Sequence, residues 1–168
     1  MGWLSRKGRG EGDASAPPSD GGGPEAAAPG KPAFEGTPVA EPLTEADSAR
    51  IRERLEELTA RGVDVDDVGS ISAAYDDARA GKGREPGGDG SEMLVDLFAI
   101  GIGEHLARHS ARQWAIVTDA FGTDLGLATA RSDSIVVPHN LVSARWMRGE
   151  VGWIPGVVAH LRSLHPRR

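Results

Sequence analysis

The chain has 168 residues, no cysteine and a formal net charge of −6 at pH 7. The absence of thiols excludes disulfides, zinc bound through thiolates and thiol catalysis, and it fits the reducing cytoplasm that we expect as the location. The acidic balance argues against nucleic acid as a partner, because phosphates favour a basic surface, and no apolar run reaches the length of a membrane span.

Residues 1–42 are predicted to be a disordered tail. They hold 9 of the 23 glycines and 7 of the 11 prolines, and such a segment buries too little apolar area to offset its loss of conformational entropy. Trp3 and Leu4 stand close to basic residues, but one weak anchor does not give stable membrane association. Residues 43–165 are predicted to form a single domain, with a flexible linker at 81–90.

The first predicted helix follows the tail and has signals at both ends. Thr44 and Asp47 have the spacing of a capping box, and Gly62 stands where a left-handed residue commonly ends a helix. Apolar residues between them recur at steps of four and three and form one stripe. That stripe is Ile51, Leu55 and Leu58, and similar spacing predicts a second helix through Val68, Ile71, Tyr75 and Ala78.

The third predicted helix is apolar almost all round, which indicates a central helix that is buried on most sides. It contains "MLVDLFAIGI", and Ser91 can cap its start. Gly101 and Gly103 lower the helix propensity and indicate the close approach of a neighbouring backbone. Asp96 is either buried and functional or, as we expect, on an exposed edge of the helix in line with Glu104.

Strand periodicity replaces helical periodicity after this helix. Trp114 and Ile116 alternate with other residues before a turn, and Leu125 and Leu127 alternate with small residues beyond it. "ARSD" predicts a second turn, and "SIVVPH" predicts a third strand that Pro138 ends. The short connections predict an antiparallel meander.

Two more helices close the sequence. Asn140 can cap the first, which Gly149 ends, and Pro155 stands in the first turn of the second. The predicted fold class is therefore α+β, in the order α-α-α-β-β-β-α-α. The helices are expected to pack on one face of a small antiparallel three-stranded sheet.

The stretch "TDAFGTDLG" predicts a hairpin turn. Four residues separate Asp119 from Asp124, and Gly122 is expected at a positive φ, which is ordinary turn chemistry. A catalytic pair of carboxylates needs a partner base or metal and a pocket, and the sequence places none close by. The alternative is a functional loop, with binding favoured over catalysis.

No metal site is expected. His105 and His109 are four residues apart and could face one metal, but no third ligand is evident, and basic residues also suit a helix C-terminus. "DVDDVG" resembles the start of a calcium loop, but Val68 and Tyr75 stand where oxygen ligands are required.

Arginine and tryptophan alternate near the C-terminus in "ARWMRGEVGW", and these residue types anchor many protein interfaces. We favour a place in the core for the same tryptophans, because tryptophan is usually largely buried. Together with the predicted turn, they define a candidate binding surface: Asp119, Phe121, Gly122, Thr123, Asp124, Arg145, Trp146 and Trp153.

The stretch "GIGEHLARHSARQWAIVTDAFGTDLGL", followed by "SIVVPHNLVSARWMRGE", resembles a bacterial family of domains of unknown function, the one numbered thirty-eight hundred and six. The resemblance covers about residues 91–165 and implies no established activity, so no catalytic residue is carried over. It rests on Gly103, Glu104, Trp114, Asp119, Phe121, Gly122, Asp124, Pro138, Arg145, Gly149 and Glu150.

We interpret the sequence as a non-catalytic binding or regulatory domain that recognises another protein. It shows no complete metal set, no nucleophile beside a base and no phosphate loop, and no cofactor is expected. The alternative is a small hydrolase-like enzyme that uses Glu104, Asp119 or Asp124 with a histidine. A deep pocket around two such side chains favours the enzyme, whereas a shallow apolar face at Trp146 and Trp153 favours binding. The sequence identifies neither the partner nor the oligomeric state.

Overall fold

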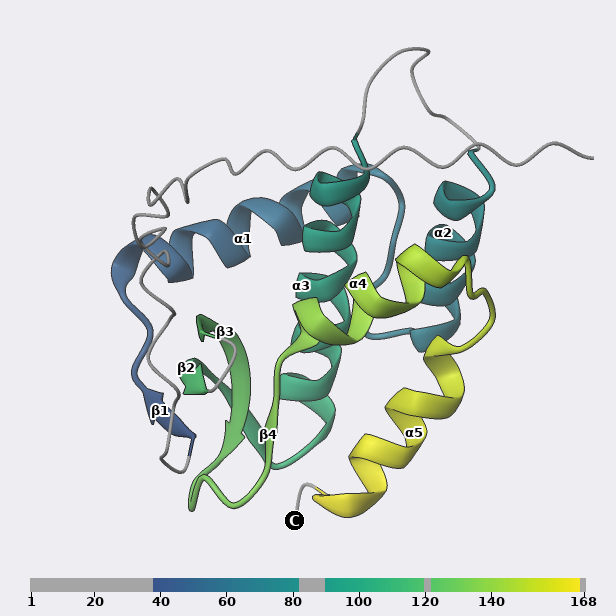
Figure 1. Ribbon diagram of the computed structural model, residues 1–168. Helices are drawn as coiled ribbons and strands as arrows, with labels where there is room; N and C mark the ends of the chain where they lie inside the picture. Colours follow the sequence, from purple (N-terminus) through teal and green to yellow (C-terminus); the bar gives the residue numbers. More distant parts are fainter. Residues whose placement is uncertain (1–37, 82–89, 120–121, 167–168) are drawn as a thin grey trace, which may run out of the picture. The chain divides into compact units, whose positions relative to one another are not determined.

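The computed structural model describes residues 38–81, 90–119 and 122–166. Residues 1–37 of the predicted tail and residues 82–89 of the predicted linker lie outside them. The α+β class is confirmed. In chain order the elements are β1 (Val39–Glu41), α1 (Glu45–Ala60), α2 (Val68–Arg79), α3 (Ser91–His109), β2 (Arg112–Asp119), β3 (Gly122–Thr129), β4 (Ile135–Val136), α4 (Pro138–Arg148) and α5 (Ile154–Leu164) (Figure 1).

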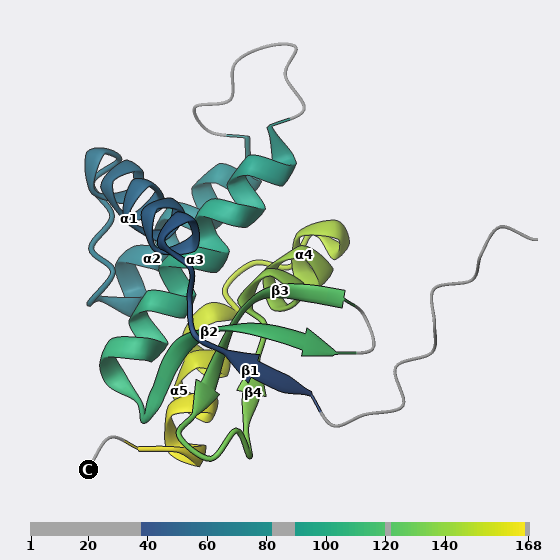
Figure 2. The same cartoon turned by 90° about the vertical axis from the view of Figure 1, so that its left-hand side faces the viewer.

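The sheet has four antiparallel strands in the order β1-β2-β3-β4, so the prediction of three strands is corrected. The additional strand is β1, which lies within the segment predicted to be tail and pairs Val39 with Thr118. Figure 2 shows β1 alongside β2, with the chain continuing from β1 into α1. Three residues in a Pro- and Gly-rich context are too few to show strand periodicity, so the sequence does not predict β1. The order of this strand comes from its pairing with β2.

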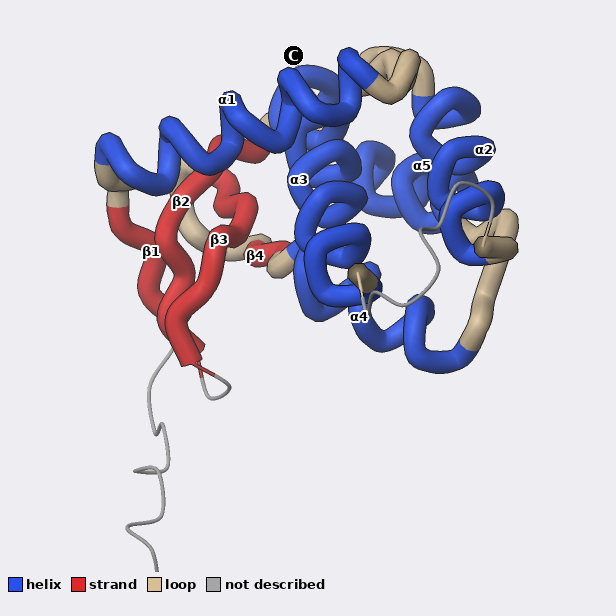
Figure 3. Tube along the Cα trace, turned by 90° about the horizontal axis from the view of Figure 1, so that it is seen from above, coloured by secondary structure: helices blue, strands red, loops and turns tan. Residues whose placement is uncertain are grey.

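The prediction that α3 is the central helix is confirmed. It contacts α1, α2, α4 and α5 as well as the two long strands. Figure 3 shows α3 between the sheet on one side and α2 and α5 on the other. A helix surrounded in this way has apolar residues all round, and its buried residues are Val95, Leu97, Phe98, Ala99, Ile100, Gly101, Ile102, Gly103, His105 and Leu106.

Two glycines of α3 make room for side chains, not for a neighbouring backbone as predicted. A Cβ atom on Gly103 would overlap the indole ring of Trp114 from β2. A Cβ atom on Gly101 would lie 2.9 Å from Cδ1 of Leu58 on α1. The missing side chains therefore let the sheet and α1 approach α3 closely from two directions.

The predicted helix ends are confirmed in part. Thr44 and Asp47 form the capping box of α1, and Gly149 ends α4 in the left-handed conformation, with φ 71°. The predicted caps at Ser91 and Asn140 are wrong, because α3 already begins at Ser91 and α4 begins at Pro138. Proline suits the first position of a helix, where its missing N–H leaves no hydrogen bond unmade.

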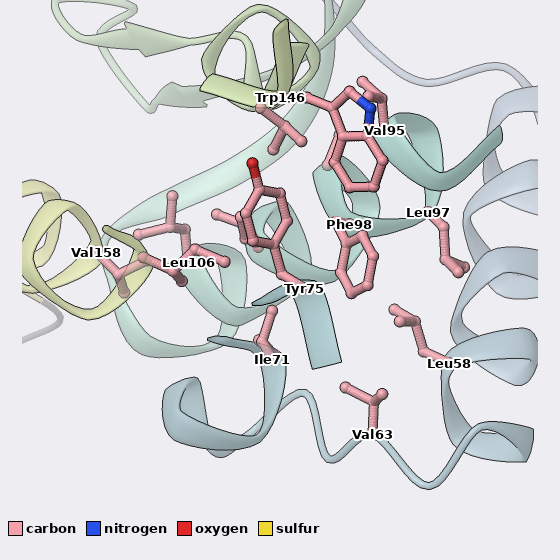
Figure 4. Packing of buried hydrophobic residues seen from close by; sticks show 14 of the residues in the cluster. Leu58, Val63, Ile71, Tyr75, Val95, Leu97, Phe98, Leu106, Trp146 and Val158 are labelled. Atoms are coloured by element: carbon pink, nitrogen blue, oxygen red, sulfur yellow. The ribbon is translucent and has the colours of Figure 1, made fainter. Parts of the chain in front are cut away.

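Tyr75 of α2 is the centre of the aromatic core. Its ring makes edge-to-face contacts with Phe98, Trp146 and Trp153, with centroid separations of 5.5, 5.5 and 5.6 Å. Figure 4 shows Tyr75 beside Phe98 of α3 and Trp146 of α4. Edge-to-face pairs of this kind add to the stabilisation from buried area, so one α2 residue joins α3, α4 and the start of α5.

Replacing Gly103 by alanine is expected to destabilise the protein by about 1–3 kcal/mol, the usual cost of overpacking a core. Helix propensity alone predicts a gain in stability for this change, since alanine is favoured over glycine in a helix by about 1 kcal/mol. Gly156→Ala on α5 is the control, because a Cβ there meets nothing within 4 Å. Chemical denaturation should show a loss of stability for Gly103→Ala and a small gain for Gly156→Ala. Equal stability of the two variants would contradict the close contact with Trp114.

Candidate functional site

The two tryptophans of the candidate surface belong to the core. Trp146 is 8% exposed, and Trp153 is half-buried against Tyr75. Arg79 lies over the ring of Trp146 at 5.4 Å, and Arg145 lies over the ring of Trp153 at 4.5 Å. Such cation–π contacts orient the guanidinium groups and cover the indoles. The structure therefore provides no exposed apolar face at the two tryptophans.

The predicted four-residue turn is shorter than expected. Asp119 pairs with Gly122 in the ladder, so residues 120 and 121 alone connect β2 to β3. Phe121 lies outside the described residues. Gly122 has φ 134°, which confirms the positive φ, and the hydroxyl of Thr123 lies 2.9 Å from that of Thr118. Asp119, Gly122 and Thr123 therefore stand in the sheet instead of an open loop.

Asp124 is an acid that the fold brings to a histidine. Its Oδ2 lies 3.8 Å from Nδ1 of His139, the second residue of α4, and its Oδ1 accepts a hydrogen bond from the Leu125 N–H at 2.7 Å. Asp124 and His139 line a small pocket together with Arg50, Asp96, Ala99, Ile100, Trp114, Leu125 and Pro138. This Asp124–His139 pocket has a volume of ≈ 10 Å³, about enough for one water molecule.

Asp96 is mostly buried instead of standing on an exposed edge of α3. Its side chain is 13% exposed and forms ion pairs with Arg50 and with Arg54, whose Nε lies 2.8 Å from Oδ2. Burial raises the pKa of Asp96, but the hydrogen bonds from Arg54 and Arg50 outweigh it and hold the pKa below its ordinary value. Asp96 is therefore an ionised link between α1 and α3.

Glu104 has a structural role in the packing of β2 on α3. One carboxylate oxygen accepts a hydrogen bond from Nε1 of Trp114 at 2.9 Å, and the other accepts one from Nε of Arg108 at 2.8 Å. Both oxygens are occupied, and the side chain does not line the Asp124–His139 pocket. Of the three acids considered for catalysis, Asp124 lies 3.8 Å from a histidine nitrogen with which it shares a pocket, and Asp119 lines a separate groove.

His105 and His109 hold the connection between α1 and α2 against α3. Nδ1 of His105 lies 2.8 Å from the carbonyl oxygen of Val65, and Nε2 of His109 lies 3.0 Å from Oδ1 of Asp66. A carbonyl oxygen accepts only, so Nδ1 of His105 carries the proton. Among the residues that the structure describes, no three His, Asp or Glu side chains converge as metal ligands.

A groove of ≈ 780 Å³ lies between β4, α4 and α5. Asp119 and Arg145 of the candidate surface line it, but sequence reasoning did not predict the groove itself, because its walls are far apart in the sequence. Asn140 was predicted only as a helix cap. Its size falls within the range of about 300–1,000 Å³ that is common for ligand sites. The lining residues are Pro38, Asp119, Ile135, Val136, Val137, Asn140, Leu141, Arg145, Gly156, Val157, His160 and Leu161.

Arg112 joins the two sides of this groove. Its guanidinium donates to the carbonyl oxygen of Leu161 on α5 at 2.8 Å and to Oγ of Ser134, just before β4, at 3.1 Å. The residue is 1% exposed, and burial lowers its pKa below the ordinary value of arginine. A cation is favourable near the C-terminus of a helix, where unpaired carbonyl groups concentrate negative charge. The sequence carries no signal for this role, because Arg112 meets both acceptors only in the folded chain.

Residues 75–155 match a family model described as Domain of unknown function (DUF3806), which confirms the resemblance. The match begins at the central tyrosine of the core, ends at the first turn of α5, and includes Asp124 and His139. No curated protein and no solved structure matches the chain. No helix in the described part of the chain is long and apolar enough to cross a bilayer.

His105 is expected to make stability fall in mildly acidic solution. Burial lowers its pKa in the folded protein below the ordinary value of 6.5. As the pH falls, His105 therefore takes up a proton in the unfolded chain before it does so in the folded protein. The contribution of neutral His105 to the free energy of unfolding is complete above about pH 6.5 and is lost as the pH falls below it. Asp66, whose pKa is lowered chiefly by its hydrogen bond with His109, titrates in a separate and more acidic range.

His105→Asn keeps an N–H donor for Val65 but removes the titrating ring. Melting temperatures between pH 7.5 and pH 5 should decline less steeply in this variant than in the wild type. His160→Asn, at an exposed histidine, should keep the wild-type slope. An unchanged slope in His105→Asn would show that another group causes the decline.

Proposed function

We propose that this domain of unknown function is a non-catalytic module that recognises another protein through the groove between β4, α4 and α5. The observation that carries the proposal is the size and lining of the groove. Partly exposed apolar side chains from three elements converge on it, with Val136 from β4, Leu141 from α4 and Val157 from α5. Contiguous apolar surface of this kind is a common mark of a protein interface.

The polar residues of the groove suit recognition of a partner. Arg145 and His160 supply positive or hydrogen-bonding groups beside the apolar walls, and Asn140 adds an amide. A few polar groups within an apolar surface fix the orientation of a ligand, while the apolar area supplies most of the affinity. The Asp124–His139 pocket differs, because its volume of ≈ 10 Å³ leaves no room for a side chain of a partner.

A charge placed in the groove should abolish recognition without unfolding the protein. Val157→Arg puts a guanidinium among the apolar walls, whereas Met147→Arg changes a side chain of α4 that is 80% exposed and does not line the groove. We expect Val157→Arg to lose at least about tenfold in binding, since a buried charge without a partner is costly. Met147→Arg should bind as the wild type does.

Affinity capture of each tagged full-length chain from its native host, followed by quantitative mass spectrometry, measures this difference. Melting curves establish that both variants are folded. Identical sets and amounts of captured proteins for the wild type and the two variants would exclude the groove as the recognition surface.

The alternative is a small hydrolase-like enzyme, and the contact between Asp124 and His139 favours it. Asp124 faces Nδ1 of His139 at 3.8 Å, which leaves Nε2 to take a proton from water. Arg50, whose side chain is 46% exposed, stands in the lining of the same pocket. A histidine oriented by a carboxylate is a common general base, and such pairs often shorten when substrate binds.

Hydrolysis of 4-nitrophenyl acetate tests the alternative directly. If the pair acts as a base, His139→Gln and Asp124→Asn should each lower the protein-dependent rate at least about tenfold. His160→Gln removes an exposed histidine outside the Asp124–His139 pocket and should leave the rate unchanged. Equal rates for the wild type and all three variants, with melting unchanged, would exclude this pair as a hydrolytic centre.

A further inference from the structure

The edge of the sheet and the helices beside it define the form of the partner. Resting on the proposed function of the groove, we propose that its occupant is an extended segment of a partner protein. This segment adds to β4 as a further strand and directs a carboxylate to Arg145 and His160. The inference names the conformation and the charge of the ligand, which the proposed function leaves open.

The backbone of β4 supplies the first argument. Among the described residues, β4 is the last strand of the sheet and pairs with β3 alone. The Thr129 N–H donates to the carbonyl oxygen of Ser134 at 3.2 Å, so these two residues form a hydrogen-bonded pair. Since such pairs alternate along an antiparallel ladder, the N–H and C=O groups of the next residue, Ile135, point away from β3. Ile135 also lines the groove, so a strand placed there could use both groups.

The spacing of the groove residues supplies the second argument. Val157 and Leu161 stand four residues apart on α5, and Leu141 and Arg145 stand four apart on α4. Four residues advance an α-helix by about 6 Å, close to the roughly 6.8 Å between alternate side chains of a strand. Alternate side chains of an extended segment therefore match successive positions along each helical wall.

Arg145 supplies the third argument. Its guanidinium is held over Trp153 and donates to the carbonyl oxygen of Leu141 at 3.1 Å. Its Nε atom is buried without a hydrogen-bond partner among the described residues, and the nearest oxygen of Glu150 lies 3.7 Å away. The arginine is therefore held in one orientation, and a carboxylate of the partner would bind the part of its guanidinium that stays accessible, since the side chain is 24% exposed. His160, in the same lining, adds a ring nitrogen that can form a hydrogen bond with a carboxylate, and Asp119 is the acid of this lining.

An α-helical ligand fits these observations less well. A helix satisfies its own backbone groups internally, so it would cover Ile135 and leave its N–H and C=O without partners. An extended segment makes those hydrogen bonds and still presents side chains to the apolar walls, as in other complexes formed by strand addition.

A displayed library of random ten-residue peptides provides the probe. The full-length chain is used for selection, and peptides that also bind Val157→Arg are discarded. We expect the remaining peptides to alternate apolar residues and to carry one acidic residue. One selected peptide is then synthesised in two forms. The first carries N-methyl groups at its odd-numbered residues, and the second carries them at its even-numbered residues. One form should lose about tenfold or more in affinity, because its N–H groups face β4, and the other should lose little.

The acidic residue of the same peptide is tested by replacement with its amide. The change should weaken binding to the wild type about tenfold, the effect of losing a charge-assisted pair, and should have little effect on binding to Arg145→Gln. Melting curves show whether Arg145→Gln is folded. If the variant does not fold, His160→Gln, at an exposed position of the same lining, takes its place in the comparison.

Five results would overturn the inference. Groove-dependent peptides with apolar residues at helical spacing, or equal affinity of the two N-methylated forms, would leave the proposed function intact but exclude strand addition. Enriched sequences that match residues 30–37 of this chain, or a dimer that Val157→Arg dissociates, would identify the chain itself as the occupant. A library that yields no peptide dependent on Val157 would instead contradict the proposed function.

Discussion

The contact between Trp114 and Gly103 fixes the distance between the sheet and α3, and the other features of the domain follow from it. The indole ring occupies the space where any other residue would carry a Cβ atom. Its Nε1 donates to Glu104, one residue further along the same helix, so the ring is fixed in orientation as well as in position. A tightly packed interior leaves little freedom for neighbouring elements, and the pocket at Asp124 and the groove beside β4 both depend on where the sheet lies.

Arg112 is a buried charged residue whose guanidinium is stabilised by hydrogen-bond acceptors from two other elements. Removing a guanidinium from water is costly, and the structure offsets the cost with the carbonyl oxygen of Leu161 and the hydroxyl of Ser134. Leu161 lines the groove on α5, and Ser134 directly precedes Ile135, which lines it on β4. The same hydrogen bonds that stabilise the buried cation therefore hold the two walls at a fixed separation, which a binding surface requires before its ligand arrives.

Features that depend on local spacing could be predicted from the sequence, and features that depend on tertiary contact could not. The capping box at Thr44 and the left-handed Gly149 are properties of a few neighbouring residues, and both predictions were confirmed. β1 was missed because three residues gain their order only from pairing with β2. His139 follows Asp124 by fifteen positions, and no periodicity relates a strand residue to the start of a helix. Tryptophan occurs in interfaces as well as in cores, and the structure places Trp146 and Trp153 in or against the core, the interpretation that the sequence favours.

The space available at each site is the reason why we propose recognition at the groove and keep catalysis at the Asp124–His139 pocket as the alternative. The Asp124–His139 pair has the residue types of a general base, but its pocket holds about one water molecule, and Arg50 beside it already neutralises Asp96. A hydrolytic reaction at that position would require the substrate to react from outside the pocket. The groove presents the opposite combination, with ample room, apolar walls from three elements and a partly exposed arginine that is held in one orientation. Because a ligand needs area to bind but only two or three groups to react, the groove is the surface that geometry favours for recognition.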